Sequence, residues 1–159
     1  SISTFTLTDQ TNQPFSSSTL HGKWTLLAFG FTHCPDVCPD TLARFKQIKT
    51  ALKTTADKVN FVFVGVDSKR DTPDVLKSYL ANFDTSFIGL SGDEQALRAA
   101  ATDFGVTFAA KQPDSEGNYA VDHTAASFLL NPDGQMVVFY SYGMDYDAML
   151  TDVQAKVSG

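Results

Sequence analysis

Apolar residues fall along the chain in short runs rich in β-branched and aromatic side chains, a pattern that predicts β-strands. The longest runs without a polar residue, Leu26 to Phe31 and Phe61 to Val66, have the length of single strands. Strands are predicted at Phe5 to Leu7, Trp24 to Phe31, Asn60 to Val66, Phe87 to Leu90, Ser127 to Leu130 and Met136 to Tyr140.

Between several of these strands, apolar residues recur at three- and four-residue spacing, which predicts amphipathic helices. The first such segment has Leu42, Phe45, Ile48 and Leu52 at this spacing and is expected to form a helix from about Pro39 to Ala56. This helix would begin at the second cysteine of the chain, so both cysteines are expected near its N-terminus.

A second helix is predicted to begin at Thr72 and Pro73, because threonine is a favoured N-cap and proline is favoured in the first turn. Its buried face would be supplied by Leu76, Tyr79, Leu80 and Phe83. Two further helices are predicted, at Asp93 to Asp103 and at Asp145 to Lys156.

The segment Asn131 to Gly134 predicts a turn, because proline presets its own φ and glycine accepts positive φ. Residues Ser127 to Tyr140 are therefore expected to form a β-hairpin. The order of strands and helices predicts an α/β protein with helices on both faces of its sheet. Since no repeat or linker interrupts the chain, we expect residues 1–159 to form a single domain.

The composition is that of a folded soluble protein and narrows the classes of partner. Apolar residues make up 43% and charged residues 19%, and 18 acidic against 12 basic residues give a formal charge of -6. Nucleic acid is not expected as a partner, because binding it begins with a basic patch that neutralises phosphates. No run approaches the roughly 20 apolar residues that span a bilayer.

The chain starts at Ser1 without a signal segment, so we expect a mature or trimmed soluble domain. Contact with a membrane is expected only through an anchor upstream of Ser1.

Two cysteines, Cys34 and Cys38, are the chemically distinctive feature of the sequence. They are too few for a disulfide scaffold or a four-thiolate iron-sulfur cluster. They lie between a predicted strand and a predicted helix start, where the positive end of the helix stabilises a thiolate. Thiolate is the form that binds metals or attacks disulfides, so both sulfurs are expected to be reactive.

The spacing of the two cysteines favours metal binding over a disulfide. Residues four apart on one helical face have Cβ atoms roughly 5 to 6 Å apart, whereas a disulfide needs about 3.8 Å. Two sulfurs on one trigonal metal lie roughly 4 Å apart if metal-sulfur bonds are about 2.3 Å, which side-chain rotamers can reach. Thiolates are soft ligands that favour Cu(I), and imidazole completes such a site.

Three histidines are candidates for the third ligand. His21 lies in a surface-like turn and is expected to be solvated, and His33 is expected to point away from its neighbour Cys34 if the strand pleat continues. His123 lies in an expected loop just before the strand at Ser127. Taken alone, a single loop histidine is more often an ordinary surface group than a ligand.

Four ordered segments resemble the Sco/SenC family of copper-binding proteins needed for cytochrome c oxidase assembly. They are Thr32 to Pro39 with its two cysteines, Val66 to Pro73, Tyr119 to Thr124 and Pro132 to Gly134. The resemblance covers nearly the whole chain and implies a thioredoxin-like fold with a central mixed sheet and flanking helices. It also implies that Cys34, Cys38 and His123 are the metal ligands.

By this resemblance the metal is copper, with Cu(I) favoured by the thiolates and Cu(II) left open, and the protein is a metallochaperone rather than an enzyme. It would deliver one copper ion to the binuclear copper site of cytochrome c oxidase, with the subunit that holds this site as its partner. Another copper donor or a thiol reductant would be a further partner. The expected location is the periplasmic face of the bacterial inner membrane or the mitochondrial intermembrane space.

Several acidic residues near the ligands have two open interpretations. Asp36 and Asp122 either orient the metal ligands and so set the metal affinity, or they are solvated carboxylates. Asp67, Arg70 and Asp71 match a family segment, and we expect them to anchor a strand end to a helix start through ion pairs.

The main alternative function is a thiol-disulfide oxidoreductase, in which Cys34 and Cys38 reduce the partner's cysteines so that copper can enter. Against it, the cysteines are spaced more widely than in Cys-x-x-Cys, and the segment 123–126 lacks the proline of thioredoxins. A thiol peroxidase is disfavoured because Leu27 and Phe31 stand where the peroxiredoxin pattern has proline and threonine. Zinc storage is disfavoured because structural zinc usually takes four ligands.

Overall fold

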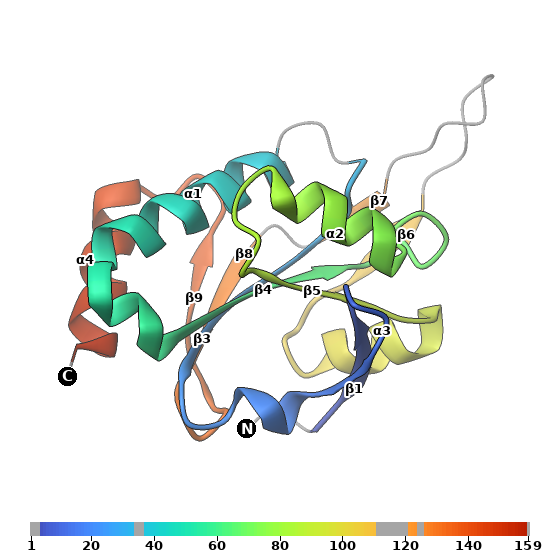
Figure 1. Ribbon diagram of the computed structural model, residues 1–159, viewed down its shortest axis with the longest axis horizontal. Coiled ribbons are helices and arrows are strands. Elements are labelled where there is room, and N and C mark those ends of the chain that lie inside the picture. The colour runs from blue at the N-terminus through green and yellow to red at the C-terminus, as the bar shows by residue number, and fades with distance from the viewer. Residues whose placement is uncertain (1–3, 34–36, 111–120, 124–125, 159) are drawn as a thin grey trace.

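The computed structural model describes residues 4–33, 37–110, 121–123 and 126–158, with the backbone alone for residues 37, 38, 109, 110 and 121–123. The strands are β1 Thr6–Asp9, β2 Pro14–Ser16, β3 Trp24–Gly30, β4 Val59–Gly65, β5 Ile88–Ser91, β6 Phe108–Ala110, β7 Val121–His123, β8 Ala126–Leu130 and β9 Met136–Ser141. The helices are α1 Val37–Leu52, α2 Pro73–Ala81, α3 Glu94–Thr102 and α4 Tyr146–Val157, with short 3-10 helices η1 Ser17–Leu20 and η2 Lys53–Lys58 (Figure 1). Within the described ranges, no helix combines the length and apolar character needed to cross a membrane.

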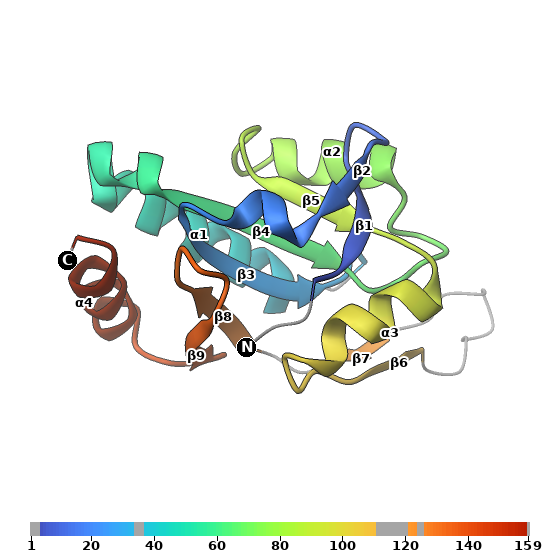
Figure 2. The ribbon, with the colours of Figure 1, turned by 90° about the horizontal axis from the view of Figure 1, so that it is seen from below.

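Seven of these strands form one mixed sheet in the order β2-β1-β5-β4-β3-β8-β9, and β6 pairs with β7 separately. Strands β3, β4 and β5 are parallel, whereas β8 and β9 continue the sheet antiparallel. Helices α2 and α3 lie on opposite sides of this sheet (Figure 2). This architecture confirms the predicted α/β class with a central mixed sheet and flanking helices.

The central strands are held by aromatic packing on both faces of the sheet. On one face, the Phe61 ring lies 6.0 Å from that of Phe45 in α1, between ring centroids. On the other face, the Phe29 ring lies 5.2 Å from that of Phe104, just after α3. Because β3 is buried from both sides, its carboxyl end at Gly30 is a rigid starting point for the segment that contains the cysteines.

The predicted strands and helices are all present, and the largest difference concerns α1. This helix begins at Val37 rather than Pro39 and ends at Leu52 rather than Ala56. Lys53 has φ 55, in the left-handed region that an α-helix cannot contain, so the chain continues as the 3-10 helix η2. The apolar spacing continued past Leu52 and did not reveal this break.

Three short strands were not predicted. Strand β2 lies between the predicted strands at Phe5 to Leu7 and Trp24 to Phe31, and β6 and β7 form a small hairpin of their own. His123, which was predicted in a loop, is the last residue of β7. Each of these strands has three residues, which is too short to show an alternating pattern.

The predicted hairpin is confirmed as β8 and β9, joined by the turn at Asn131 to Gly134. The Asn131 side-chain oxygen accepts hydrogen bonds from the backbone N–H groups of Asp133 and Gln135, both at 3.0 Å. Gly134 has φ 81, the positive value for which glycine was expected at this position.

Candidate metal centre

The predicted ligands belong to chain segments that lead to the carboxyl end of β3. Cys34 lies outside the described residues, shortly after Gly30 in the sequence. Cys38 is the second residue of α1, and the structure describes its backbone. His123 ends β7, and β8 begins three residues later, with Ser127 opposite Ala28 of β3.

Strand β8 is antiparallel to β3, so its first residue, Ala126, lies towards the carboxyl end of β3, and Figures 1 and 2 show β7 in the same region. The Cys34 segment begins after this end of β3 in the sequence. The ligating atoms themselves are not among the described ones. Among the described residues, no group of three His, Cys, Asp or Glu side chains could hold a metal ion.

The position of β7 is fixed through its partner strand. His123 pairs with Phe108 of β6, a residue that is buried. The guanidinium of Arg98, in α3, lies over the Phe108 ring at 4.5 Å and donates a hydrogen bond to the Phe108 carbonyl at 3.0 Å. These contacts attach the hairpin to α3, and no local pattern of residues predicted them. The backbone of His123 is thus part of a strand that packs onto the domain.

The N-terminus of α1 brings a partial positive charge to Cys38. The unpaired N–H groups of the first helical turn favour anionic groups, thiolates included. Asp40 lies in this first turn, and its carboxylate accepts a hydrogen bond from the hydroxyl of Tyr142 at 2.9 Å. The first turn of α1 is therefore connected to the segment between β9 and α4.

The segment just before Cys34 is attached to the core by a buried carboxylate. Asp71 accepts two hydrogen bonds from Thr32 at the same oxygen, one from its N–H at 3.0 Å and one from its hydroxyl at 2.7 Å. The other oxygen of Asp71 accepts the N–H of Asp67 at 3.1 Å. Asp71 has no exposed surface, and burial raises the pKa of its carboxyl although the hydrogen bonds from Thr32 and Asp67 oppose this.

The neighbouring Arg70 makes the ion pair that the sequence led us to expect. Its Nε donates to the carboxylate of Asp67, and the same carboxylate accepts the N–H groups of Lys69 and Arg70, both at 3.2 Å. The Arg70 guanidinium also lies 6.0 Å from the centre of the Phe31 ring. The expectation that Asp67, Arg70 and Asp71 anchor a strand end is confirmed, but Asp71 does so through hydrogen bonds to Thr32.

The other two histidines lie as expected for surface groups. His33 is exposed, with its Nδ1 atom 3.3 Å from the Thr32 hydroxyl. His21 is exposed and packs beside Gly134 in the β8–β9 turn. Of the acidic residues left open above, Asp36 lies outside the described residues and Asp122 is described by its backbone in β7.

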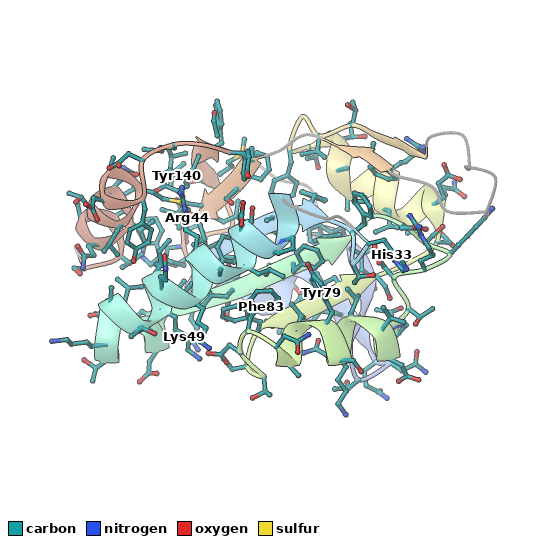
Figure 3. All side chains as sticks on the ribbon, turned by 90° about the horizontal axis from the view of Figure 1, so that it is seen from above. His33, Arg44, Lys49, Tyr79, Phe83 and Tyr140 are labelled. Carbon is teal, nitrogen blue, oxygen red and sulfur yellow. The ribbon has the colours of Figure 1, made fainter. Side chains whose placement is uncertain are left out.

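A groove of about 390 Å³ begins beside Asp40 and runs between α1, β9 and α4. Arg44 lies in this groove, where it donates a hydrogen bond to the carbonyl of Met144 at 2.6 Å. Tyr140 lies close to it, on the face of β9 that is turned towards α1 (Figure 3). This groove was not predicted, because its walls come from segments far apart in the chain.

Comparison with known proteins gives one consistent family. Residues 1–158 match the profile of a family described as SCO1/SenC. The mouse protein named "Protein SCO2 homolog, mitochondrial" is 33% identical over 156 residues, which are 97% of this chain and 61% of the mouse protein. The chain spans between 61% and 64% of the length of the curated relatives that it matches first.

Two solved structures extend this result to the fold. ScoI of Bradyrhizobium japonicum, solved with copper bound, is 38% identical, with a TM-score of 0.87 over 98% of this chain and 99% of that one. BsSco, described with a disulfide switch as a member of the Sco family of cytochrome c oxidase assembly proteins, is 26% identical, with a TM-score of 0.75 over 99% and 93%. The implied thioredoxin-like fold is thereby confirmed.

Proposed function

Because the chain belongs to the SCO1/SenC family, we propose that it binds one copper ion through Cys34, Cys38 and His123 and carries it to a partner protein. The observation that supports this proposal is that the described backbones of β7 and of the first turn of α1 both lie in the region of the carboxyl end of β3 (Figure 1). The copper-bound relative from Bradyrhizobium japonicum supports copper as the metal.

The chemistry of the three residues fits Cu(I). Two thiolates are soft ligands that this ion prefers, and an imidazole completes a site of low coordination number. The helix end at Cys38 favours the deprotonated sulfur that binding requires. A site with three protein ligands also leaves the metal accessible to one more, so a partner's thiolate can bind before the first ligands leave.

We propose that the partner is the cytochrome c oxidase subunit with the binuclear copper site, in line with the description of the Sco family as assembly proteins. The protein would act at the periplasmic face of the bacterial inner membrane or in the mitochondrial intermembrane space. In this role it is a metal carrier and not an enzyme. A further copper donor or a thiol reductant would be needed to load or reset it.

An anaerobic titration against a coloured Cu(I) chelator tests the site. We expect one copper per chain and a loss in His123→Ala of more than about tenfold in affinity, since changes behind a ligand already cost that much. His21→Ala is the matched control, because this exposed histidine packs on the β8–β9 turn, and it should bind as wild type does. Full affinity in His123→Ala, or no copper bound by wild type, would refute the proposed ligands.

Transfer is tested by mixing the copper-loaded protein with the copper-free soluble domain of the oxidase subunit. Copper should appear on the subunit, detected by metal analysis of each protein after the two are separated. If copper stays with the carrier at equimolar partner, delivery in this direction is refuted while copper binding stands.

A thiol-disulfide oxidoreductase is the second candidate, and the disulfide switch described for BsSco favours it. In that role, the thiolate of Cys34 or Cys38 attacks a partner disulfide, and the other cysteine then displaces the partner's thiol. One disulfide forms on this chain as one is reduced on the partner. Catalytic turnover of a partner disulfide by the copper-free protein with a thiol reductant would support this role, and an inert cysteine pair would exclude it.

A further inference from the structure

We propose that Asp71 is a positioning residue for the copper site, which fixes Thr32 and thereby the point from which the cysteine segment leaves the core. This inference rests on the copper site proposed above. Asp71 belongs to a different part of the chain from the ligands, and its partner Thr32 is 39 residues away in the sequence. The two segments meet because β3 and β4 are neighbours in the sheet.

Asp71 is the acceptor in three hydrogen bonds. One carboxylate oxygen accepts both the N–H and the hydroxyl of Thr32, and the other accepts the N–H of Asp67. A carboxylate accepts at both oxygens, whereas an asparagine amide would direct an NH2 group at one of these donors. The two acceptor oxygens of Asp71 therefore match the three donors around it, although burying a carboxylate is unfavourable.

The glycine at the end of β4 leaves room for the Asp71 side chain. A Cβ atom at Gly65, the last residue of β4, would lie 2.8 Å from the Cβ of Asp71 and 3.0 Å from its carboxylate oxygen. Any larger residue at this position would displace the carboxylate from Thr32. The position of the Asp71 carboxylate thus depends on the absence of a side chain at Gly65.

Thr32 is the last place at which the chain can be held in this way before Cys34. Phe31 is buried, Thr32 is half-buried and His33 is exposed, so the chain leaves the core within three residues. Cys34 follows two residues after Thr32, which limits the distance between their Cα atoms to about 7 Å. On the other side, Cys38 is fixed by α1, whose Leu42 and Phe45 are fully buried. The position of Thr32 therefore limits the separation of the two sulfurs.

A purely structural anchor would look the same in the structure, so the experiment compares Asp71 with a matched carboxylate. Asp84 also accepts an N–H and a hydroxyl at one oxygen, both from Ser86, and a third donor, Lys49, at the other. It lies after α2 and supports the C-terminal end of α1. Asp71→Asn and Asp84→Asn thus remove the same kind of group at the metal centre and away from it.

In the chelator titration we expect Asp71→Asn to bind Cu(I) about tenfold or more weakly, the size typical of groups behind a metal ligand. The thiolate-to-Cu(II) charge-transfer band should shift, because the sulfur geometry changes. Asp84→Asn should bind within about twofold of wild type with an unshifted band, even where both variants lose similar stability. Equal copper affinities and spectra for Asp71→Asn and wild type would overturn the proposal.

Two variants of Thr32 keep the test decisive if Asp71→Asn folds poorly. Thr32→Val keeps the backbone N–H bond but removes the hydroxyl, and should weaken copper binding and shift the band. Thr32→Ser restores the hydroxyl and should return both towards wild type. If valine and serine behave alike, the hydrogen bond to Asp71 does not position the site.

A copper-free measurement separates this inference from the proposed function. In the amide NMR spectrum, Asp71→Asn should move the resonances of Thr32 and of the segment up to Cys38, while Asp84→Asn should leave them in place. If wild type bound no copper but these shifts appeared, the proposed function would fail, and with it the effect on copper affinity, while the anchoring of the cysteine segment by Asp71 would stand. Unchanged resonances in this segment would overturn the positioning role even in a protein that binds copper.

Discussion

Neutralising Asp84 should lower the stability of the protein at neutral pH and have little effect in acid. The Asp84 carboxylate accepts a hydrogen bond from Lys49 Nζ at 2.7 Å, which joins the last turn of α1 to the segment after α2. Burial acts to raise the pKa of Asp84, but the hydrogen bonds from Lys49 and Ser86 outweigh it and lower the pKa from 3.8 to about 2. The native state therefore favours the ionised carboxylate.

A lowered pKa in the folded state gives stability that is complete above the unfolded value of 3.8 and disappears as the pH falls towards 2. At about 1.36 kcal/mol for each pH unit, this difference sets an upper bound of about 2.4 kcal/mol. The side chains of Lys49 and Asp84 are 32% and 23% exposed, so solvent screens part of it. We expect Asp84→Asn to cost about 1 kcal/mol at pH 7.

The assay is urea unfolding of wild type and Asp84→Asn at several pH values between 7 and 3, followed by the fluorescence of Trp24. The difference in free energy of unfolding should be constant from pH 7 to about 5 and should shrink below pH 4. Glu94→Gln is the control, because the Glu94–Arg98 pair is largely exposed and should be worth no more than about 0.5 kcal/mol. A difference for Asp84→Asn that stays constant down to pH 3 would refute the assignment to ionisation.

Three further substitutions test the packing and hydrogen bonds. Gly65→Ala should cost about 2 kcal/mol in urea unfolding, because its methyl group would lie 2.8 Å from Asp71 Cβ; a neutral result would mean that Asp71 can move. Tyr140→Phe removes the hydroxyl that donates to Asp152 at 2.6 Å and should cost about 1 kcal/mol at pH 7. Unchanged stability of Tyr140→Phe would mean that the hydrogen bond to Asp152 contributes no net stability. Thr72→Ala removes the N-cap of α2 and should lower the free energy of unfolding by about 1 kcal/mol, whereas Thr72→Ser should recover most of it.

The elements at the centre of the domain could be predicted because their signals are local. The uninterrupted apolar run of Phe61 to Val66 forms most of β4, which ends at Gly65, and Thr72 and Pro73 start α2 as their chemistry requires. The same holds for the turn at Asn131 to Gly134, where Gly134 supplies the positive φ. In each case the deciding interaction lies within a few residues of the sequence.

The parts that were missed depend on partners far apart in the chain. The strand that contains His123 exists because β6 pairs with it and Arg98 of α3 contacts Phe108, and a three-residue strand has no pattern of its own. The bond between Thr32 and Asp71 spans 39 residues, so spacing could not reveal it. For the metal ligands themselves, physical reasoning supports Cys34 and Cys38, whereas the choice of His123 came from the family resemblance and stays a prediction.

The proposed copper carrier would have to hold its ligands in place and still release the metal, and the described residues at the carboxyl end of β3 are compatible with both needs. Hydrogen bonds are strongest where water is excluded, which here is the level of Asp71 and the half-buried Thr32. One residue further the chain is exposed at His33, where a partner's thiolate could approach. The anchoring of Thr32 by Asp71 therefore does not block a partner's approach from the exposed side at His33. It follows that substitutions at Asp71 should change how tightly copper is held more than how fast a partner can reach it.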